Sequence, residues 1–204
     1  MECAAKKVLD PPGRSQAARP DACFHPPIRP RRRATPDAAF SLKQVPCPHC
    51  QHTGTLNRHS RLLGNDPDSA DGQCRRGQRV FCSNRGRRGG CGRTFSLFYS
   101  DVLPRHTVSA TWLWRLLVGM LAGRSLKATV ESIGWPLALE TGYALVRRVR
   151  GRLHEWRSRL CRKRAPPASG QSDPVLQTAE HLQGVFAGCA LKEFQLQFQS
   201  SLLG

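Results

Sequence analysis

The chain has 204 residues, which is enough for one modest domain or two very small ones. Its 32 Lys and Arg residues against 14 Asp and Glu residues give a formal net charge of +18. Such a charge creates a positive field that attracts polyanions, although a GC-rich coding bias would also raise the arginine content. The most apolar segment, Trp112 to Ala122, is too short to cross a bilayer, so we expect no membrane partner.

Nine cysteines are the second unusual feature of the composition. Residues 1–10 lack the apolar core of a signal peptide, and we therefore expect a cytoplasmic, nucleoid-associated bacterial protein. Disulfides are disfavoured in that compartment. The cysteines therefore need another use, and metal binding is the first candidate.

Residues 1–39 predict a disordered basic arm. Pro11-Pro12-Gly13 and the run Pro30-Arg31-Arg32-Arg33 break helices and strands, and few large apolar side chains are present to form a core. The basic cluster fits three interpretations: an arm along a phosphate backbone, a solvated tail, or an extension read from a misassigned start codon.

Residues 40–100 are rich in Cys, Gly and Arg and predict a metal-stabilised β zinc ribbon. Cys47-Pro48-His49-Cys50 is a C-x2-C knuckle, a tight turn that presents two thiolates to one ion, and a second pair follows. Four thiolates form the closed tetrahedral site of structural zinc, whose binding supplies folding energy to a small domain. The expected Zn²⁺ ligands are Cys47, Cys50, Cys82 and Cys91.

The second pair departs from the usual knuckle, because eight residues separate Cys82 from Cys91. Two alternatives therefore stay open. A substitute ligand is one of them, and the candidates are Cys74, His49 and His52. The other has Cys82 and Cys91 as small buried side chains without a metal. We do not expect catalytic zinc, because four thiolates leave no open position for water.

Residues 105–164 show helical spacing of apolar side chains and predict three helices. Ser109 and Ser125 are predicted N-caps of the first two helices, and Gly134 suits the turn before the third, which extends to about Leu160. Its predicted inward positions are Leu139, Tyr143, Val146, Val149 and Leu153. Residues 165–204 read as a linker and a weakly structured tail with one helix near 175–190.

The predicted helices fit a helix-turn-helix domain, in which the last helix enters the major groove of DNA. An ordinary three-helix bundle with a solvated basic face is the alternative. In the first interpretation the ribbon grips the backbone or minor groove, and the last helix reads base edges with its first turn and phosphates with its later arginines. The expected DNA-binding residues are Arg85, Arg87, Arg88, Arg93, Glu140, Thr141, Arg147, Arg148, Arg150 and Arg152.

Two motifs carry a resemblance to a known group of proteins. The residues Cys47-Pro48-His49-Cys50, followed after a long spacer by Arg79-Val80-Phe81-Cys82 and by Cys91-Gly92-Arg93-Thr94-Phe95-Ser96, resemble the N-terminal zinc ribbon of insertion-sequence transposases and their small DNA-binding partners. Phage late-gene activator zinc fingers share part of this pattern and tolerate a wider second knuckle. The run of Thr141, Tyr143, Arg147 and Arg148 resembles the recognition helix that follows the ribbon in the same transposases.

The resemblance implies a small α+β, zinc-dependent DNA-binding protein of transposase type that recognises a specific duplex site without cutting it. Its expected partners are double-stranded DNA, a separate transposase catalytic subunit and, as a homodimer, a second copy. We expect no enzymatic activity, because the stretch after Leu160 is too short for a domain that converges carboxylates on Mg²⁺. The alternatives are a truncated relic of a transposase and an RNA-binding zinc-ribbon protein.

Overall fold

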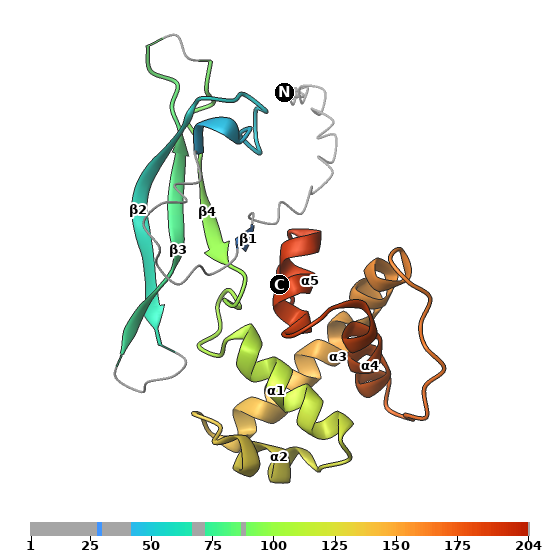
Figure 1. Cartoon of the computed structure of the whole chain (residues 1–204). Helices are drawn as coiled ribbons and strands as arrows, with labels where there is room; N and C mark the ends of the chain where they lie inside the picture. Colours follow the sequence, from blue (N-terminus) through green and yellow to red (C-terminus); the bar gives the residue numbers. More distant parts are fainter. Residues whose placement is uncertain (1–27, 30–41, 67–71, 87–88, 204) are drawn as a thin grey trace, which may run out of the picture.

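The protein is a small α+β protein in which a β-sheet precedes a group of helices. The computed structural model describes residues 28–29, 42–66, 72–86 and 89–203, so the predicted disordered arm lies almost wholly outside the described residues. Figure 1 shows the sheet on one side of the molecule and the helices on the other, joined by residues 100–109.

The sheet has the strand order β1-β4-β3-β2. Its strands are β1 (Ile28–Arg29), β2 (Leu56–Asn65), β3 (Gln73–Cys82) and β4 (Thr94–Tyr99). β2 with β3 and β3 with β4 pair antiparallel, whereas β1 runs parallel to β4. A 3-10 helix, η1 (Leu42–Gln44), precedes the sheet.

A small core lies on one face of the sheet. Because side chains alternate between faces along a strand, one residue in two points into this core. Its buried members are Cys47, Leu56, Val80, Cys82, Phe95 and Leu97. This cluster is small for an independent domain, so the sheet needs a further source of stability.

The three predicted helices are confirmed as α1 (Ala110–Leu121), α2 (Leu126–Ile133) and α3 (Leu139–Cys161). Both predicted N-caps are also confirmed. The Ser109 hydroxyl accepts a hydrogen bond from the Trp112 amide at 3.3 Å, and the Ser125 hydroxyl accepts one from the Ala128 amide at 3.2 Å. Gly134 ends α2 in the left-handed conformation, with φ of 65°.

The helix predicted near residues 175–190 is present, but the prediction of a weakly structured tail with one helix is wrong, because two helices follow the linker. α4 (Pro174–Val185) and α5 (Ala190–Phe198) pack against α1 and α3 and complete the main core. The core residues that the tail contributes are Val175, Ala179, Leu182, Ala190, Leu191, Phe194 and Leu202. The tail is therefore an integral part of the helical unit.

Gln195 of α5 anchors the segment that leads from the sheet to α1. Its side chain is fully buried, and its amide nitrogen donates to the carbonyls of Ser100 at 2.6 Å and Val102 at 3.2 Å. Its amide oxygen accepts a hydrogen bond from the backbone N–H of Leu202. A buried amide with partners on both its atoms fixes the position of the joint between sheet and helices.

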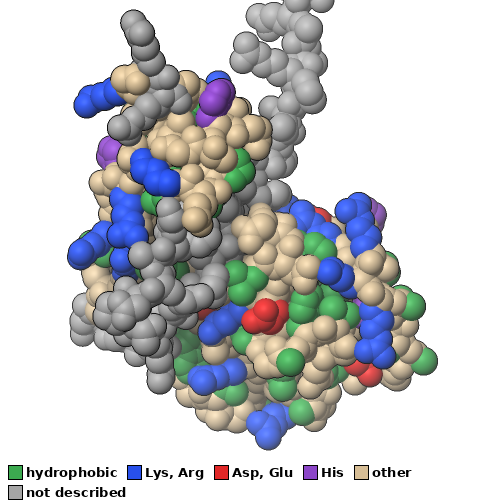
Figure 2. Space-filling model, turned by 45° about the horizontal axis from the view of Figure 1, so that its top comes forward, with side chains coloured by type: hydrophobic (Ala, Val, Ile, Leu, Met, Phe, Trp, Pro, Cys, Tyr) green, Lys and Arg blue, Asp and Glu red, His purple; other side chains and the backbone are tan. Residues whose placement is uncertain are grey.

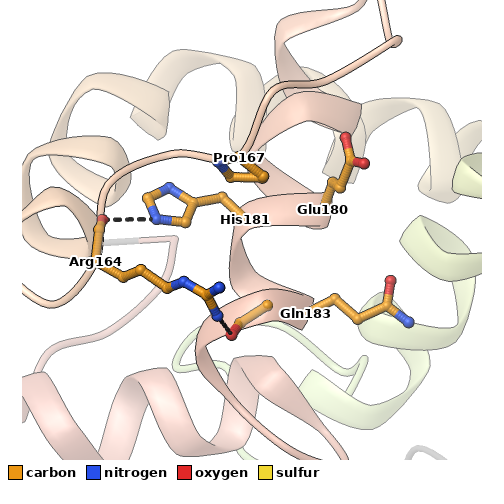
Figure 3. A pocket seen from close by; sticks show the side chains of 6 residues that line it. Arg164, Pro167, Glu180, His181 and Gln183 are labelled. Atoms are coloured by element: carbon orange, nitrogen blue, oxygen red, sulfur yellow. Dashed lines mark hydrogen bonds between the residues drawn. The ribbon is translucent and has the colours of Figure 1, made fainter.

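The linker folds back onto α4 and leaves an open pocket of about 290 Å³ (Figure 3). The Arg164 guanidinium donates to the carbonyl of Gly184 at 2.8 Å, and His181 Nε2 lies 2.9 Å from the carbonyl of Arg164. Glu180 accepts a hydrogen bond from Ser169. These contacts hold the linker against α4, and we assign them a structural role.

None of the helices in the described part of the chain combines the length and the apolar character that a membrane span requires.

The role of Gln195 predicts a specific loss of stability. Gln195→Leu leaves two carbonyls and one N–H without their partner, and each unsatisfied buried group costs about 1–3 kcal/mol. We expect a lower midpoint of urea unfolding, followed by circular dichroism. The matched control is Gln197→Leu, which places the same substitution at an exposed position of the same helix. Equal midpoints for the two variants would contradict the anchoring role.

Candidate metal centre

The four cysteines predicted as ligands converge at one end of the sheet. Their sulfur atoms all lie within 4.8 Å of one another. Cys47 Sγ is 3.8 Å from Cys91 Sγ, and Cys50 Sγ is 3.7 Å from Cys82 Sγ. A tetrahedron with metal–sulfur bonds of about 2.3 Å has edges of about 3.8 Å. The cluster can therefore hold one tetrahedral metal ion without rearrangement of these two pairs.

Backbone hydrogen bonds close the first knuckle. The amide of Cys47 donates to the carbonyl of His52 at 2.9 Å, and the amide of Gln51 donates to the carbonyl of Cys47 at 2.8 Å. Gln51 has a φ of 62°, a left-handed conformation that turns the chain directly after Cys50.

The second knuckle is closed by the same two bonds despite its longer spacer. The amide of Cys82 donates to the carbonyl of Arg93 at 2.9 Å, and the amide of Gly92 donates to the carbonyl of Cys82 at 3.0 Å. Gly92 follows Cys91 with a φ of 71° and occupies the position of Gln51 in the first knuckle. Residues 83–90 are therefore an insertion into a knuckle whose ends still meet.

Hydrogen-bond donors surround the sulfur atoms. The amides of His49 and Cys91 point at the sulfurs of Cys47 and Cys82, at 3.4 and 3.3 Å. The buried hydroxyl of Thr55 lies 3.2 Å from Cys82 Sγ. Donors of this kind stabilise thiolates. No motif in the sequence marks Thr55 as part of the site, because its contact with Cys82 depends on the pairing of β2 with β3.

The thiols differ in acidity. Burial raises the pKa of the Cys47 thiol to about 12. The backbone hydrogen bond from His52 lowers the pKa of the Cys50 thiol to about 6. A metal ion that takes all four sulfurs as thiolates must displace the proton of Cys47, so binding of the metal releases protons.

The substitute ligands lie outside the cluster. Cys74 is at the opposite end of β3 from Cys82, and its sulfur faces the carbonyl of Asn65 at 3.7 Å. The His49 ring packs edge-on against Phe95, with centroids 6.1 Å apart. His52 is exposed, and its Nδ1 lies 3.1 Å from the carbonyl of Cys50. Within the described residues, the cluster consists of the four predicted cysteines.

The predicted DNA-binding residues of the ribbon flank the second knuckle. Arg85 and Arg93 are exposed there. Arg87 and Arg88 lie outside the described residues.

On α3, some of the predicted DNA-binding side chains are exposed, and others form ion pairs within the protein. Glu140, Arg147 and Arg148 are exposed, and Thr141 is half-buried. Arg150 instead pairs with Asp173, the N-cap of α4, at 2.8 Å, and Arg152 pairs with Glu155 at 2.5 Å. The sequence could not reveal the first of these pairs, because the position of α4 was not predicted.

The prediction that Tyr143 points inward is wrong. Tyr143 is 50 % exposed, one of two large hydrophobic side chains described as exposed. The buried stripe of α3 begins one residue earlier, at Gly142, which lies against Leu126 and Val130 of α2. One residue turns a helix by about 100°, so burial of Gly142 rotates Tyr143 toward solvent beside Arg147.

The cluster predicts which cysteines matter for metal binding. Cys91→Ser removes one of four thiolates, and we expect loss of stoichiometric metal binding and a lower melting temperature. Cys74→Ser is the control, and we expect it to retain one metal ion per chain. Metal content after dialysis and thermal unfolding measure both effects. Retention of tight binding by Cys91→Ser would exclude Cys91 as a ligand.

The insertion also depends on a close backbone approach. A Cβ atom at Gly90 would lie 2.0 Å from the carbonyl oxygen of Ser83, whereas one at Gly86 would meet no atom within 4 Å. We expect Gly90→Ala to open the knuckle and weaken metal binding at least tenfold in a chelator competition. Gly86→Ala, in the same insertion, adds only the strain of a left-handed alanine at a φ of 63°, about 1 kcal/mol, and we expect its affinity to fall less than about fivefold. Equal affinities for the two variants would show that the knuckle closes in another way.

The comparisons with known proteins found no relative of this chain. No family model, no curated protein and no solved structure matches the chain. The metal cluster is thus described by its own residues, and the resemblance to the transposase group comes from the motif residues alone.

Proposed function

We propose that this protein is a zinc-dependent DNA-binding protein of transposase type, which recognises a duplex site without cutting it. In this proposal residues 40–100 form a zinc ribbon and α1 to α3 form a helix-turn-helix domain. The single observation that carries the DNA-binding function is the exposed basic face of α3 around Arg147 and Arg148.

Zinc is the metal that suits the ligand set best. Thiolates are soft ligands, and a tetrahedral set of four thiolates favours zinc or an iron–sulfur centre. Sulfur–sulfur distances of 3.7 and 3.8 Å fit the edges of a mononuclear zinc site. Four thiolates fill the tetrahedron and leave no position for water. The ion therefore serves the fold of the ribbon, whose six-residue core needs that contribution.

The connection between α2 and α3 supports the helix-turn-helix interpretation. Gly134 turns the chain in the left-handed conformation, and the buried Trp135 then fixes the turn against the helical core. The edge of the Trp135 ring contacts Trp112 of α1, with centroids 6.1 Å apart. A short, packed turn of this kind holds the second helix at a defined angle to the first, as entry into a major groove requires.

The face of α3 away from α2 provides the contact surface. Ala144, Arg147 and Gly151 are exposed at helical spacing, so a long cation projects between two small side chains. Arg147 forms no ion pair or hydrogen bond with any described residue. Small neighbours allow a duplex to approach closely, and a free guanidinium suits phosphate oxygens and guanine edges. On the face seen in Figure 2, further Lys and Arg side chains lie over both the sheet and the helices.

Selection from a random DNA duplex pool tests this function. The full chain is used, because the tail contributes to the helical core. We expect one enriched sequence at near-physiological salt and its loss after zinc is removed with a chelator, since the ribbon unfolds without the ion. Salt-sensitive binding with no enriched sequence, indifferent to the chelator, would contradict the proposal. Stronger retention by structured RNA than by any duplex would favour the RNA-binding alternative.

A further inference from the structure

A groove of about 370 Å³ lies where the far end of the β2–β3 hairpin meets the segment before α1. We call it the hairpin groove. Its walls come from parts of the chain that are distant in sequence. The lining residues are Leu62, Leu63, Gly64, Asn65, Arg76, Phe98, Pro104, Arg105, His106 and Thr107.

Three arginines from three different elements meet around this groove. Arg76 of β3 lies beneath it and donates hydrogen bonds to the carbonyls of Leu103, at 3.0 Å, and of His106. Arg148 of α3 lies 3.0 Å from His106 Nε2. Arg105 is exposed at the rim, in a left-handed conformation with φ of 65°. The groove is thus directly connected to the DNA-binding face proposed on α3.

The charges around the groove are poorly balanced. Asp101 is the carboxylate that acts on Arg76, and it is buried. No described carboxylate pairs with Arg105 or Arg148. Burial and the nearby charges of Arg148 and Arg76 lower the pKa of His106, which favours its neutral form. A neutral ring can accept the hydrogen bond from Arg148, which leaves the other donors of that guanidinium for an anion.

We propose that the hairpin groove binds a backbone phosphate of the same duplex that α3 contacts, with Arg105 and Arg148 as its cationic ligands. The inference deepens the proposed function and depends on it. A phosphodiester suits the site because arginine forks bind phosphate oxygens, and the apolar wall of Leu63 and Pro104 can contact a deoxyribose. An apolar peptide would leave both guanidiniums without an anionic partner. His106 positions Arg148 and does not itself contact the phosphate.

The salt dependence of duplex binding tests the groove. The probe is the duplex enriched by the selection described above, bound to the zinc-loaded full chain. We expect Arg105→Gln to weaken binding several-fold and to reduce the slope of log K against log salt by about 0.9, the value for one lost phosphate contact. The matched control is Arg162→Gln, which removes the same charge at the exposed C-cap of α3. We expect the control to leave the slope unchanged.

A second variant separates a lost contact from a damaged fold. Arg105→Gly removes the cation and relieves the left-handed backbone, so its thermal stability should not fall while the slope drops as in Arg105→Gln. Equal slopes for both Arg105 variants and Arg162→Gln would overturn the groove, with the proposed function left standing. Failure of the wild-type chain to enrich any duplex would overturn the proposed function itself.

A scan of the duplex with single methylphosphonates locates the contact. Each substitution removes the charge of one phosphate. We expect one position at which the wild type loses affinity and Arg105→Gln does not, because the variant has already lost that contact. Equal sensitivity of both proteins at every position would also overturn the inference.

Discussion

The meeting of four thiols at one end of the sheet is the constraint on which the rest of the sheet and its loops depend. Cys82 ends β3, contacts the hydroxyl of Thr55 through its sulfur and closes the second knuckle through Arg93. Cys82 therefore links three features of the fold. These are the pairing of β2 with β3, the return of the chain into β4 and the position of the insertion. In a core as small as this one, a metal ion bound to the four thiolates would supply free energy that offsets the conformational entropy of the loops.

A second constraint joins the sheet to the helices. The segment 100–109 is held by Gln195 from one side and by Arg76 from the other, so helix α5 and strand β3 both donate hydrogen bonds to the segment that leads into α1. A rigid joint matters for the proposed function, because two DNA-contacting units can act on one duplex only if their separation and angle are defined. The tail of the chain, with no evident role in the sequence, supplies one half of this joint.

The local elements could be predicted from the sequence, whereas the contacts between them could not. The roles of Ser109, Ser125 and Gly134 depend on backbone groups only a few residues away. Their residue types therefore predict the two caps and the turn. The four cysteines are equally distinctive, because few other uses exist for thiols at that spacing. Tyr143 was predicted on the wrong face of α3, and Arg150 was predicted without its ion-pair partner. Both errors come from tertiary contacts. Their environments are set by Gly142 at the crossing with α2 and by Asp173 on α4. Gln195 also carries no local signal, since the two carbonyls to which its amide nitrogen donates lie more than ninety residues away.

The insertion in the second knuckle has a consequence for how this protein can vary. Its two ends are fixed by the hydrogen bonds between Cys82, Gly92 and Arg93, which are made in the same way in a knuckle that has no insertion. Because the cost of closing a loop grows only slowly with its length, residues can be added or removed between Ser83 and Gly90 while the metal site is kept. The insertion is thus a suitable place to change the length of the chain or to graft a tag or an extra binding loop.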